Sequence, residues 1–330
     1  MLLFIIVVFA AIAFEYINGF HDAANAIATV VSTKVLTPRQ AIALAAFFNL
    51  TGALMGTAVA STIGKGIVET RVITMATVLC ALLAAIIWNL VTWWLGLPSS
   101  SSHALIGGLC GSAVASAGGD WSILQWETGL MPKVVVPMFT SPVVGFFLGG
   151  ILMALLFALL RPFTPHIVHK IFGKMQLVSA AWMAHSHGTN DAQKTMGIIA
   201  VLLFSQGMLG GKFHVPFWVV ISCQAAMGLG TLLGGWKIVH TMGSKITRLT
   251  PAQGFCAETG GAITLFMATH LGVPVSTTHT ITGAIVGVGA SRRLSAVRWN
   301  VASSIIVAWV VTLPAAALIG AAFYELTRLF

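Results

Sequence analysis

Long charge-poor stretches constrain the possible folds of this chain more than any other feature. One membrane-spanning helix needs roughly 20 consecutive apolar residues, and stretches of about that length recur along nearly the whole sequence. They run roughly over residues 1–33, 40–62, 72–97, 99–117, 134–160, 176–205, 214–236, 254–273, 274–290 and 299–326. With 57% hydrophobic and 8% charged residues, the 330-residue chain carries more apolar surface than its own core could bury. We therefore expect an all-α polytopic membrane protein with about 10–12 transmembrane segments rather than a soluble protein.

The charges are few and isolated. The 17 Lys and Arg exceed the 8 Asp and Glu, but no basic run or basic helix face of the kind that binds nucleic acid is present. The positive-inside rule instead groups the basic loops on the cytoplasmic side, provided that 99–117 and 274–290 each cross once. These loops contain Lys34 and Arg39, then Arg161, Lys170 and Lys174, then Lys237, Lys245 and Arg248, then Arg292, Arg293 and Arg298. We expect a location in the cell membrane, both termini on its outer side, and the lipid bilayer as the main surrounding partner.

The sequence gives no sign of enzyme chemistry. Four cysteines lie scattered in apolar segments without C-x-x-C spacing, so neither a disulfide framework nor a zinc site is expected. No nucleophile–base pairing and no cofactor motif is present, so we predict neither an enzyme nor a cofactor. The first thirteen residues lack the Lys or Arg that opens a signal peptide, and we interpret them as the start of a retained span.

Two pairs of matched segments divide the chain into halves. Residues 18–25 (Asn-Gly-Phe-His-Asp-Ala-Ala-Asn) align with 187–194 (His-Gly-Thr-Asn-Asp-Ala-Gln-Lys), and residues 95–103 (Leu-Gly-Leu-Pro-Ser-Ser-Ser-Ser-His) align with 271–279 (Leu-Gly-Val-Pro-Val-Ser-Thr-Thr-His). Because five predicted crossings precede the second copy, the halves have opposite orientations, as in the inverted repeats of secondary transporters. We predict two transmembrane repeats, 1–160 and 161–330.

Four of the stretches are unusual as single spans. Residues 1–33 and 176–205 are longer than one helix needs and are polar at their centres, while 99–117 and 274–290 are short and begin with proline and Ser/Thr clusters. Broken helices and Ser/Thr-led hairpins are therefore expected in these regions.

Carboxylates within the spans are candidates for binding a coupling ion. Asp22 and Asp191 stand at matched positions of the two copies. Intramembrane carboxylates are energetically costly, and their recurrence favours a role with a cation or a proton over purely structural pairing. We predict coupling-ion roles for Asp22, Asn25, Asn190, Asp191 and Glu258. Glu258 has no counterpart in the first half, so it is either a third ion or proton ligand or the partner of a nearby polar group.

The Ser/Thr clusters offer the complementary chemistry for an anion. Each follows a proline and opens an apolar segment, so its hydroxyls and free backbone N–H groups lie at the start of a helix. The candidate residues are Ser100, Ser101 and Ser102 with Ser276, Thr277 and Thr278. Plain N-capping is the alternative for each cluster taken alone. A histidine (His103, His279) and a G-x-x-x-G pair follow each cluster; we interpret the glycines as close-packing sites and leave the histidines open between proton transfer and packing.

These motifs together resemble the PiT family of inorganic phosphate transporters. Residues 19–25, continuing as Ala-Ile-Ala-Thr, and residues 186–198 are similar to its two signature segments, and 98–103 and 274–279 are similar to its paired hairpin motifs. The resemblance covers essentially the whole chain and, without the large intracellular loop of animal members, is to the short bacterial form. It implies a carrier that brings inorganic phosphate inward with Na⁺ or H⁺, with Asp22, Asn25, Asp191 and both Ser/Thr clusters around the substrate and its ions.

One departure from the family pattern bears on coupling. Lys194 stands where the first copy has Asn25, so a fixed positive charge replaces an oxygen ligand. We predict that Lys194 takes the place of one sodium and leaves proton coupling dominant; any Na⁺ would bind at Asp22, Asn25 and Asp191. Phosphate is then held by the Ser/Thr clusters, Gln193 and Lys194, in an alternating-access cycle.

Several alternatives stay open at this level. The resemblance extends to a sulfate-permease branch and to carriers of divalent metal–phosphate complexes, and an anion channel is a rival from another class. G-x-x-x-G patches at Gly52–Gly56 and Gly145–Gly149 permit a homodimer but equally permit internal packing.

Overall fold

The computed structural model describes residues 2–52 and 56–329, and in these ranges the chain is almost entirely helical, with one isolated β-bridge between Val68 and Leu124. The α-helices are α1 (Leu2–His21), α2 (Ala23–Ser32), α3 (Pro38–Thr51), α4 (Ala58–Gly66), α5 (Met75–Leu95), α6 (Ser101–Ser116), α7 (Val136–Leu160), α8 (Pro165–Ser205), α9 (Phe217–Thr231), α10 (Trp236–His240), α11 (Pro251–His270), α12 (Thr277–Arg292) and α13 (Trp299–Thr327). Short 3₁₀ turns are η2 (Thr70–Val72), η3 (Trp121–Ile123) and η6 (Leu294–Ala296), and π-helical segments are η4 (Trp126–Val135) and η5 (Thr241–Lys245).

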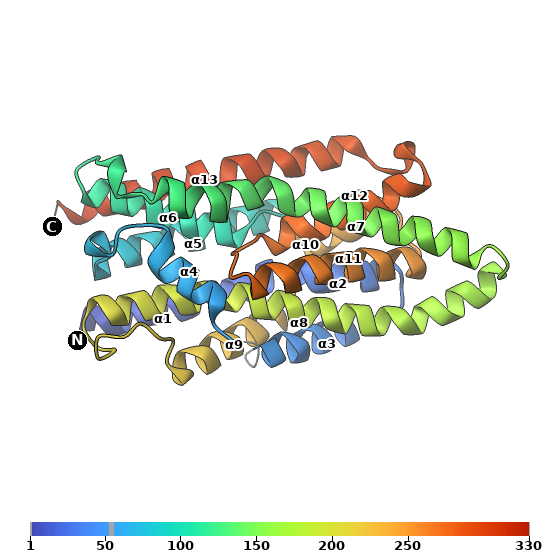
Figure 1. The fold of residues 1–330 in the computed structure, drawn as a ribbon, viewed down its shortest axis with the longest axis horizontal. Helices are drawn as coiled ribbons and strands as arrows, with labels where there is room; N and C mark the ends of the chain where they lie inside the picture. The colour runs from blue at the N-terminus through green and yellow to red at the C-terminus, as the bar shows by residue number, and fades with distance from the viewer. Residues whose placement is uncertain (1, 53–55, 330) are drawn as a thin grey trace.

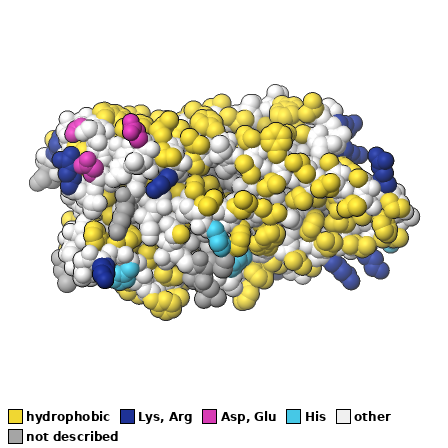
Figure 2. Space-filling view, in the orientation of Figure 1, with side chains coloured by type: hydrophobic (Ala, Val, Ile, Leu, Met, Phe, Trp, Pro, Cys, Tyr) yellow, Lys and Arg dark blue, Asp and Glu magenta, His cyan; other side chains and the backbone are white. Residues whose placement is uncertain are grey.

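The molecule has the composition of a multi-pass membrane protein. Within residues 2–52 and 56–329, four helical segments are long and apolar enough to cross a bilayer: Leu2–Ser32, Met75–Leu95, Trp126–Leu160 and Trp299–Thr327. Phe217–Thr231 and Trp236–Lys245 qualify as one further span that is bent by 65°. Helices α7, α8 and α13 run along the long axis, and both chain ends lie at the same end of the molecule (Figure 1). Apolar side chains cover the middle of the visible face, while charged side chains lie towards its two ends (Figure 2).

Helices α5 and α6 form one hairpin, and α11 and α12 form another. The first arm of each ends at a glycine in the left-handed conformation, Gly96 (φ 68°) or Gly272 (φ 66°), which a residue with a side chain rarely adopts. Backbone hydrogen bonds join the outer ends of each hairpin, from Glu69 to Ile123 (3.0 Å) and from Arg298 to Ile246 (2.9 Å). Each hairpin therefore returns to the end of the molecule from which it started.

This arrangement confirms the Ser/Thr-led hairpins and corrects one assumption about topology. The segments 99–117 and 274–290 were expected to cross once each, but they are the returning arms of the hairpins. The first arms, 72–97 and 254–273, were also expected to cross. Two expected crossings are therefore replaced in each hairpin by one arm that enters and one that returns, so the basic loops lie at the same ends as predicted.

The two long polar stretches differ from each other. Residues 1–33 break at Asp22 (φ −94°, ψ 2°), between α1 and α2, as predicted for a broken helix. The predicted break within 176–205 is wrong, because α8 continues for 41 residues, about 60 Å at 1.5 Å per residue. No proline follows its first position, and Asn190 and Lys194 at its centre donate to side chains of α11 and α6, so its backbone bonds need no interruption. The stretch 40–62 divides into α3 and α4, although 53–55 lie outside the described residues.

The polar centre lies between two apolar cores. One core takes Ala180, Met183 and Ala184 from α8 together with residues of α2, α7, α11 and α12. The other takes later α8 residues, such as Met196 and Ile199, together with residues of α1, α4, α5, α6 and α9. The stretch of α8 between these two sets contains Asp191, so the fold places the candidate residues where the two cores meet.

Candidate functional site

The two Ser/Thr-led helices begin at the same place. Ser100 accepts a hydrogen bond from the backbone N–H of His103, and Ser276 accepts one from the backbone N–H of His279, both at 3.2 Å. These two serines are therefore the N-caps of α6 and α12. The rings of His103 and His279 lie 4.9 Å apart between centroids. The positive ends of two helix dipoles thus meet inside the molecule.

Asp191 and Lys194 of α8 lie beside these helix starts. The Lys194 ammonium donates to Asp191 Oδ1, to Ser102 Oγ (2.5 Å) and to the carbonyl oxygen of Val275 (2.8 Å). Thr277 Oγ1 donates to Asp191 Oδ2 at 2.9 Å. A single turn of α8 therefore contacts both clusters, and the buried ammonium has three oxygen acceptors.

The break between α1 and α2 supplies the other side of the site. Asn25 Nδ2 donates to Thr277 Oγ1 and to Thr278 Oγ1, both at 3.0 Å. Asp22 Oδ1 lies 2.6 Å from His21 Nδ1, and the same ring nitrogen lies 3.5 Å from Ser101 Oγ. Residues predicted from the two sequence copies are thus brought together around both Ser/Thr clusters.

Asp22 and Asp191 also form a group that can hold a cation. One ligand atom each from Asp22, His187 and Asp191 lie within 4.8 Å of one another, and His187 Nε2 is 3.3 Å from Asp191 Oδ2. Carboxylate oxygens suit a hard cation such as Na⁺, and the imidazole nitrogen adds affinity for a transition metal. His187 was not among the predicted ion ligands, although its i,i+4 spacing to Asp191 on α8 is visible in the sequence. The approach of Asp22 could not be predicted in this way, because Asp22 lies on another element.

Three of the predicted residues pair with side chains or backbone away from both the Ser/Thr clusters and the two aspartates. Gln193 Oε1 accepts from the backbone N–H of Val59 (2.9 Å) at the start of α4, and Asn190 Nδ2 donates to Thr269 Oγ1 on α11 (2.8 Å). Glu258 accepts hydrogen bonds from a separate set of side chains, namely Thr29 Oγ1, Gln176 Nε2 and Ser179 Oγ. Glu258 therefore pairs with polar neighbours, one of its two predicted alternatives, and a role in ion binding stays a prediction.

The site is closed to solvent from both ends. The exposed fraction is 3% for Asp22, 2% for Ser101, 1% for Asp191 and 2% for Lys194. A solute that reaches these side chains must therefore enter through a rearrangement of the surrounding helices.

The chain belongs to the phosphate transporter family, which residues 18–320 match. A probable low-affinity inorganic phosphate transporter of Rhizobium meliloti (strain 1021) is 59% identical over 315 residues, covering 95% of this chain and 93% of that protein. A protein of the same description from Bacillus subtilis (strain 168) is 46% identical over 333 residues, covering 100% and 99%. These relatives are named as transporters, in accord with the expectation that the chain is not an enzyme, and their names give no support to the sulfate alternative.

A solved structure has the same fold. It is described as the sodium-dependent phosphate transporter, and it superposes on this chain with a TM-score of 0.91 at 27% sequence identity, covering 100% of both chains. The family resemblance drawn from the sequence motifs is therefore confirmed, and the chain is a multi-pass membrane protein.

Proposed function

We propose that this protein imports inorganic phosphate across the cell membrane by cation symport, through alternating access to the site between Asp22 and Asp191. The observation that carries the proposal is the meeting of the α6 and α12 N-termini beside two carboxylates. Thr277 donates to Asp191, while the hydroxyls of the other cluster residues contact the neighbours of the carboxylates, Ser101 with His21, Ser102 with Lys194 and Thr278 with Asn25. Hydroxyls and helix N-termini suit a tetrahedral oxyanion, while carboxylates suit the cation that offsets its charge.

The division of labour follows from the contacts. Thr277 and Thr278 are hydrogen-bonded to Asn25, and Ser102 to Lys194, so their hydroxyls exchange these partners for phosphate oxygens when the substrate enters. Ser100 and Ser276 act through the helix starts that they cap. The group Asp22, His187 and Asp191 receives the coupling cation, and it is also the place where the metal of a divalent metal–phosphate complex would bind.

The two halves of the chain, 1–160 and 161–330, act as inverted repeats in this proposal. Its support is the pairing of hairpins, because α5–α6 opens from the end that holds both termini and α11–α12 opens from the other end (Figure 1). Rocking of one half against the other would expose the site first to one side and then to the opposite side.

The coupling ion depends on Lys194. Its ammonium already has three oxygen acceptors, which is the environment that a bound sodium would otherwise take. We propose that Lys194 replaces one sodium and leaves protons as the dominant coupling ion. The solved relative is named as sodium-dependent, so the two proteins would differ in this property.

The test of the function is radiolabelled phosphate uptake into proteoliposomes that contain the purified protein. Sodium and proton gradients are imposed separately, and excess unlabelled sulfate and a divalent-metal chelator are added in parallel arms. Accumulation driven by a proton gradient and insensitive to sulfate is the expected result. Flux that equilibrates without accumulation under either gradient would indicate a channel and overturn the proposal.

Lys194→Asn tests the coupling ion separately. The variant restores the residue of the first copy, and we expect its uptake to become dependent on sodium. Lys212→Asn removes the same charge from an exposed position and should leave the ion dependence of the wild type. If Lys194→Asn keeps the wild-type ion dependence, the role given to Lys194 is wrong while phosphate transport itself stands.

A further inference from the structure

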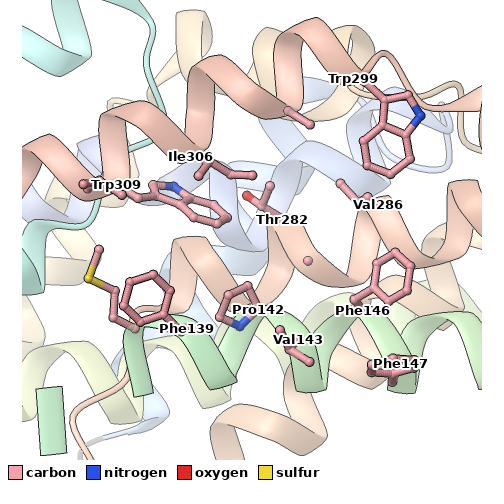
Figure 3. Close-up of a pocket in the computed structure, with 14 residues that line it drawn as sticks. Phe139, Pro142, Val143, Phe146, Phe147, Thr282, Val286, Trp299, Ile306 and Trp309 are labelled. Atoms are coloured by element: carbon pink, nitrogen blue, oxygen red, sulfur yellow. The ribbon is translucent and has the colours of Figure 1, made fainter. Parts of the chain in front are cut away.

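An apolar groove outside the transport site lies between α7 and α13, with α12 as its floor. Its volume is about 450 Å³. In Figure 3, Phe139, Val143 and Phe146 project from α7 and Trp299, Ile306 and Trp309 belong to α13. Thr282 on α12 contributes the one side-chain hydroxyl among the 14 lining residues. The groove opens on the outside of the molecule, because Phe139 is 58% exposed and Ile306 is 51% exposed.

The length of the groove along α13 matches one leaflet of a bilayer. Along α13 it extends from Trp299 to Val310, a rise of about 16 Å. The hydrocarbon core of a membrane is about 30 Å thick, so this is close to half of it. One end reaches Trp309, which contacts the central site, and the other reaches the loop between α12 and α13.

The end of the groove at the α12–α13 loop is positively charged. Trp299, which lines that end, directly follows Arg298, and Arg292 and Arg293 lie across the same short loop. The two latter side chains are exposed, as is Arg298. An apolar channel of one-leaflet length that ends at several arginines fits a lipid with an acyl chain and an anionic headgroup, since each basic side chain near the surface attracts such headgroups.

The deep wall of the groove contacts both helix starts of the transport site. The Trp309 ring stacks on the His279 ring with 3.9 Å between centroids, and its indole N–H donates to the carbonyl oxygen of Pro98 at 3.0 Å. His279 directly follows the Ser/Thr cluster of α12, and Pro98 directly precedes that of α6. Trp309 therefore bridges the two elements that must move relative to each other during alternating access.

We propose that this groove binds the acyl chain of an anionic phospholipid whose headgroup lies on the α12–α13 arginines, and that its occupancy sets the packing of Trp309 and hence the rate of transport. The second part rests on the proposed function, whereas the first part concerns lipid binding alone.

The experiment fills the groove with a side chain. Ile306→Trp places an indole in the groove, and Ile151→Trp makes the same change on α7 at a position that is 53% exposed and does not line the groove. Native mass spectrometry of detergent-purified protein, with added phosphatidylglycerol or phosphatidylcholine, counts retained lipids. We expect the wild type and Ile151→Trp to retain one phosphatidylglycerol that Ile306→Trp loses. Equal retention by both variants would overturn the lipid site.

Two further measurements separate the headgroup and the coupling. Arg298→Gln should lower the preference for phosphatidylglycerol over phosphatidylcholine about fivefold, since one basic residue near the surface contributes on the order of 1 kcal/mol. An unchanged preference would contradict the assigned headgroup site.

Uptake by the wild type should be faster in vesicles with phosphatidylglycerol than in pure phosphatidylcholine, and uptake by Ile306→Trp should be the same in both kinds of vesicle. If lipid is retained but wild-type uptake ignores it, the regulatory part is wrong; if no phosphate is transported at all, the retention result still decides the binding site.

Discussion

Neighbouring hydroxyls within each Ser/Thr cluster have different partners. Ser276 accepts from a backbone N–H as the cap of α12, whereas Thr277, the next residue, donates to the Asp191 carboxylate. The capping interpretation therefore applies to Ser276, while ligand binding by Thr277 stays a prediction. The sequence could not separate them, because the assignment depends on which side of the helix start faces α8.

Substitution of these two residues should have opposite consequences. Ser276→Ala removes a helix cap and should lower the free energy of unfolding by about 1 kcal/mol while preserving most uptake. Thr277→Ala removes a hydrogen bond to a charged group, typically about 1.5–3 kcal/mol, and should lower uptake about tenfold or more. Melting temperature in detergent and initial uptake rate are measured for both. Loss of uptake by Ser276→Ala at an unchanged melting temperature would instead make Ser276 a direct ligand.

Asp191 and Lys194 should depend on each other. Asp191→Asn leaves a buried ammonium without a counter-charge, and breaking a buried pair in this way costs about 3–5 kcal/mol. The double variant Asp191→Asn with Lys194→Met removes both charges and should recover much of that stability without recovering uptake. Denaturation and uptake of the two single variants and the double variant test this. A double variant as unstable as Asp191→Asn would show that the carboxylate is needed for the fold by itself.

The candidate site could be predicted to the extent that it repeats. Asp22, Asn25, Asp191 and Lys194 stand at matched positions, and the last three contact residues of the Ser/Thr clusters. Asp22 is linked to Ser101 through the ring of His21. Gln193 was assigned to the same site, but its side chain turns to the start of α4. Which side of a helix faces which neighbour depends on packing between distant segments, and a single sequence does not contain that information.

At the scale of helices, glycines set how closely the hairpins approach the long spans. A Cβ on Gly111 of α6 would lie 1.9 Å from the carbonyl oxygen of Ala317 on α13, and one on Gly287 of α12 would lie 2.0 Å from that of Phe146 on α7. The G-x-x-x-G pairs are therefore close-packing sites, as predicted. Gly145 likewise packs on Thr280, so that patch serves internal packing.

Gly287→Ala should weaken the contact between α7 and α12. Overpacking of this kind typically costs about 1–3 kcal/mol, because backbone atoms on both helices must move apart. Gly173→Ala is the matched control on α8, where a Cβ would meet no atom within 4 Å and should raise helix stability slightly. Thermal unfolding in detergent compares the two. Equal melting temperatures would mean that α7 and α12 tolerate separation and that the short distance has no energetic weight.

Element boundaries were predictable where local chemistry decides them. The proline and Ser/Thr pattern predicted the starts of α6 and α12, the returning arms of the hairpins, and the polar centre of 1–33 predicted the break at Asp22. The same reasoning failed for α8, which continues without a break while Asn190 and Lys194 at its centre donate to side chains of other helices. Length and polarity indicate that a segment needs polar partners, but they do not show whether its own backbone or its neighbours provide them.

At the scale of the whole molecule, the two ends differ in charge. One end carries the basic loops around Arg161 and Arg292–Arg293, and the end with both termini also carries acidic side chains (Figures 1 and 2). Glu69 and the loop with Asp120 are joined there by the hydrogen bond between Glu69 and Ile123. From the positive-inside rule we therefore predict that the Arg161 end faces the cytoplasm.

This orientation can be tested with protease-cleavable tags at the N-terminus, at the C-terminus and in the Arg161–Thr164 turn. In spheroplasts we expect both terminal tags to be cleaved from outside and the turn tag only after lysis, because the arginines hold their loop on the cytoplasmic side. The orientation also decides the leaflet of the groove, since the α12–α13 arginines lie at the same end as Arg161. Cleavage of the turn tag in intact spheroplasts would reverse the assignment, and the anionic lipid would then have to come from the outer leaflet.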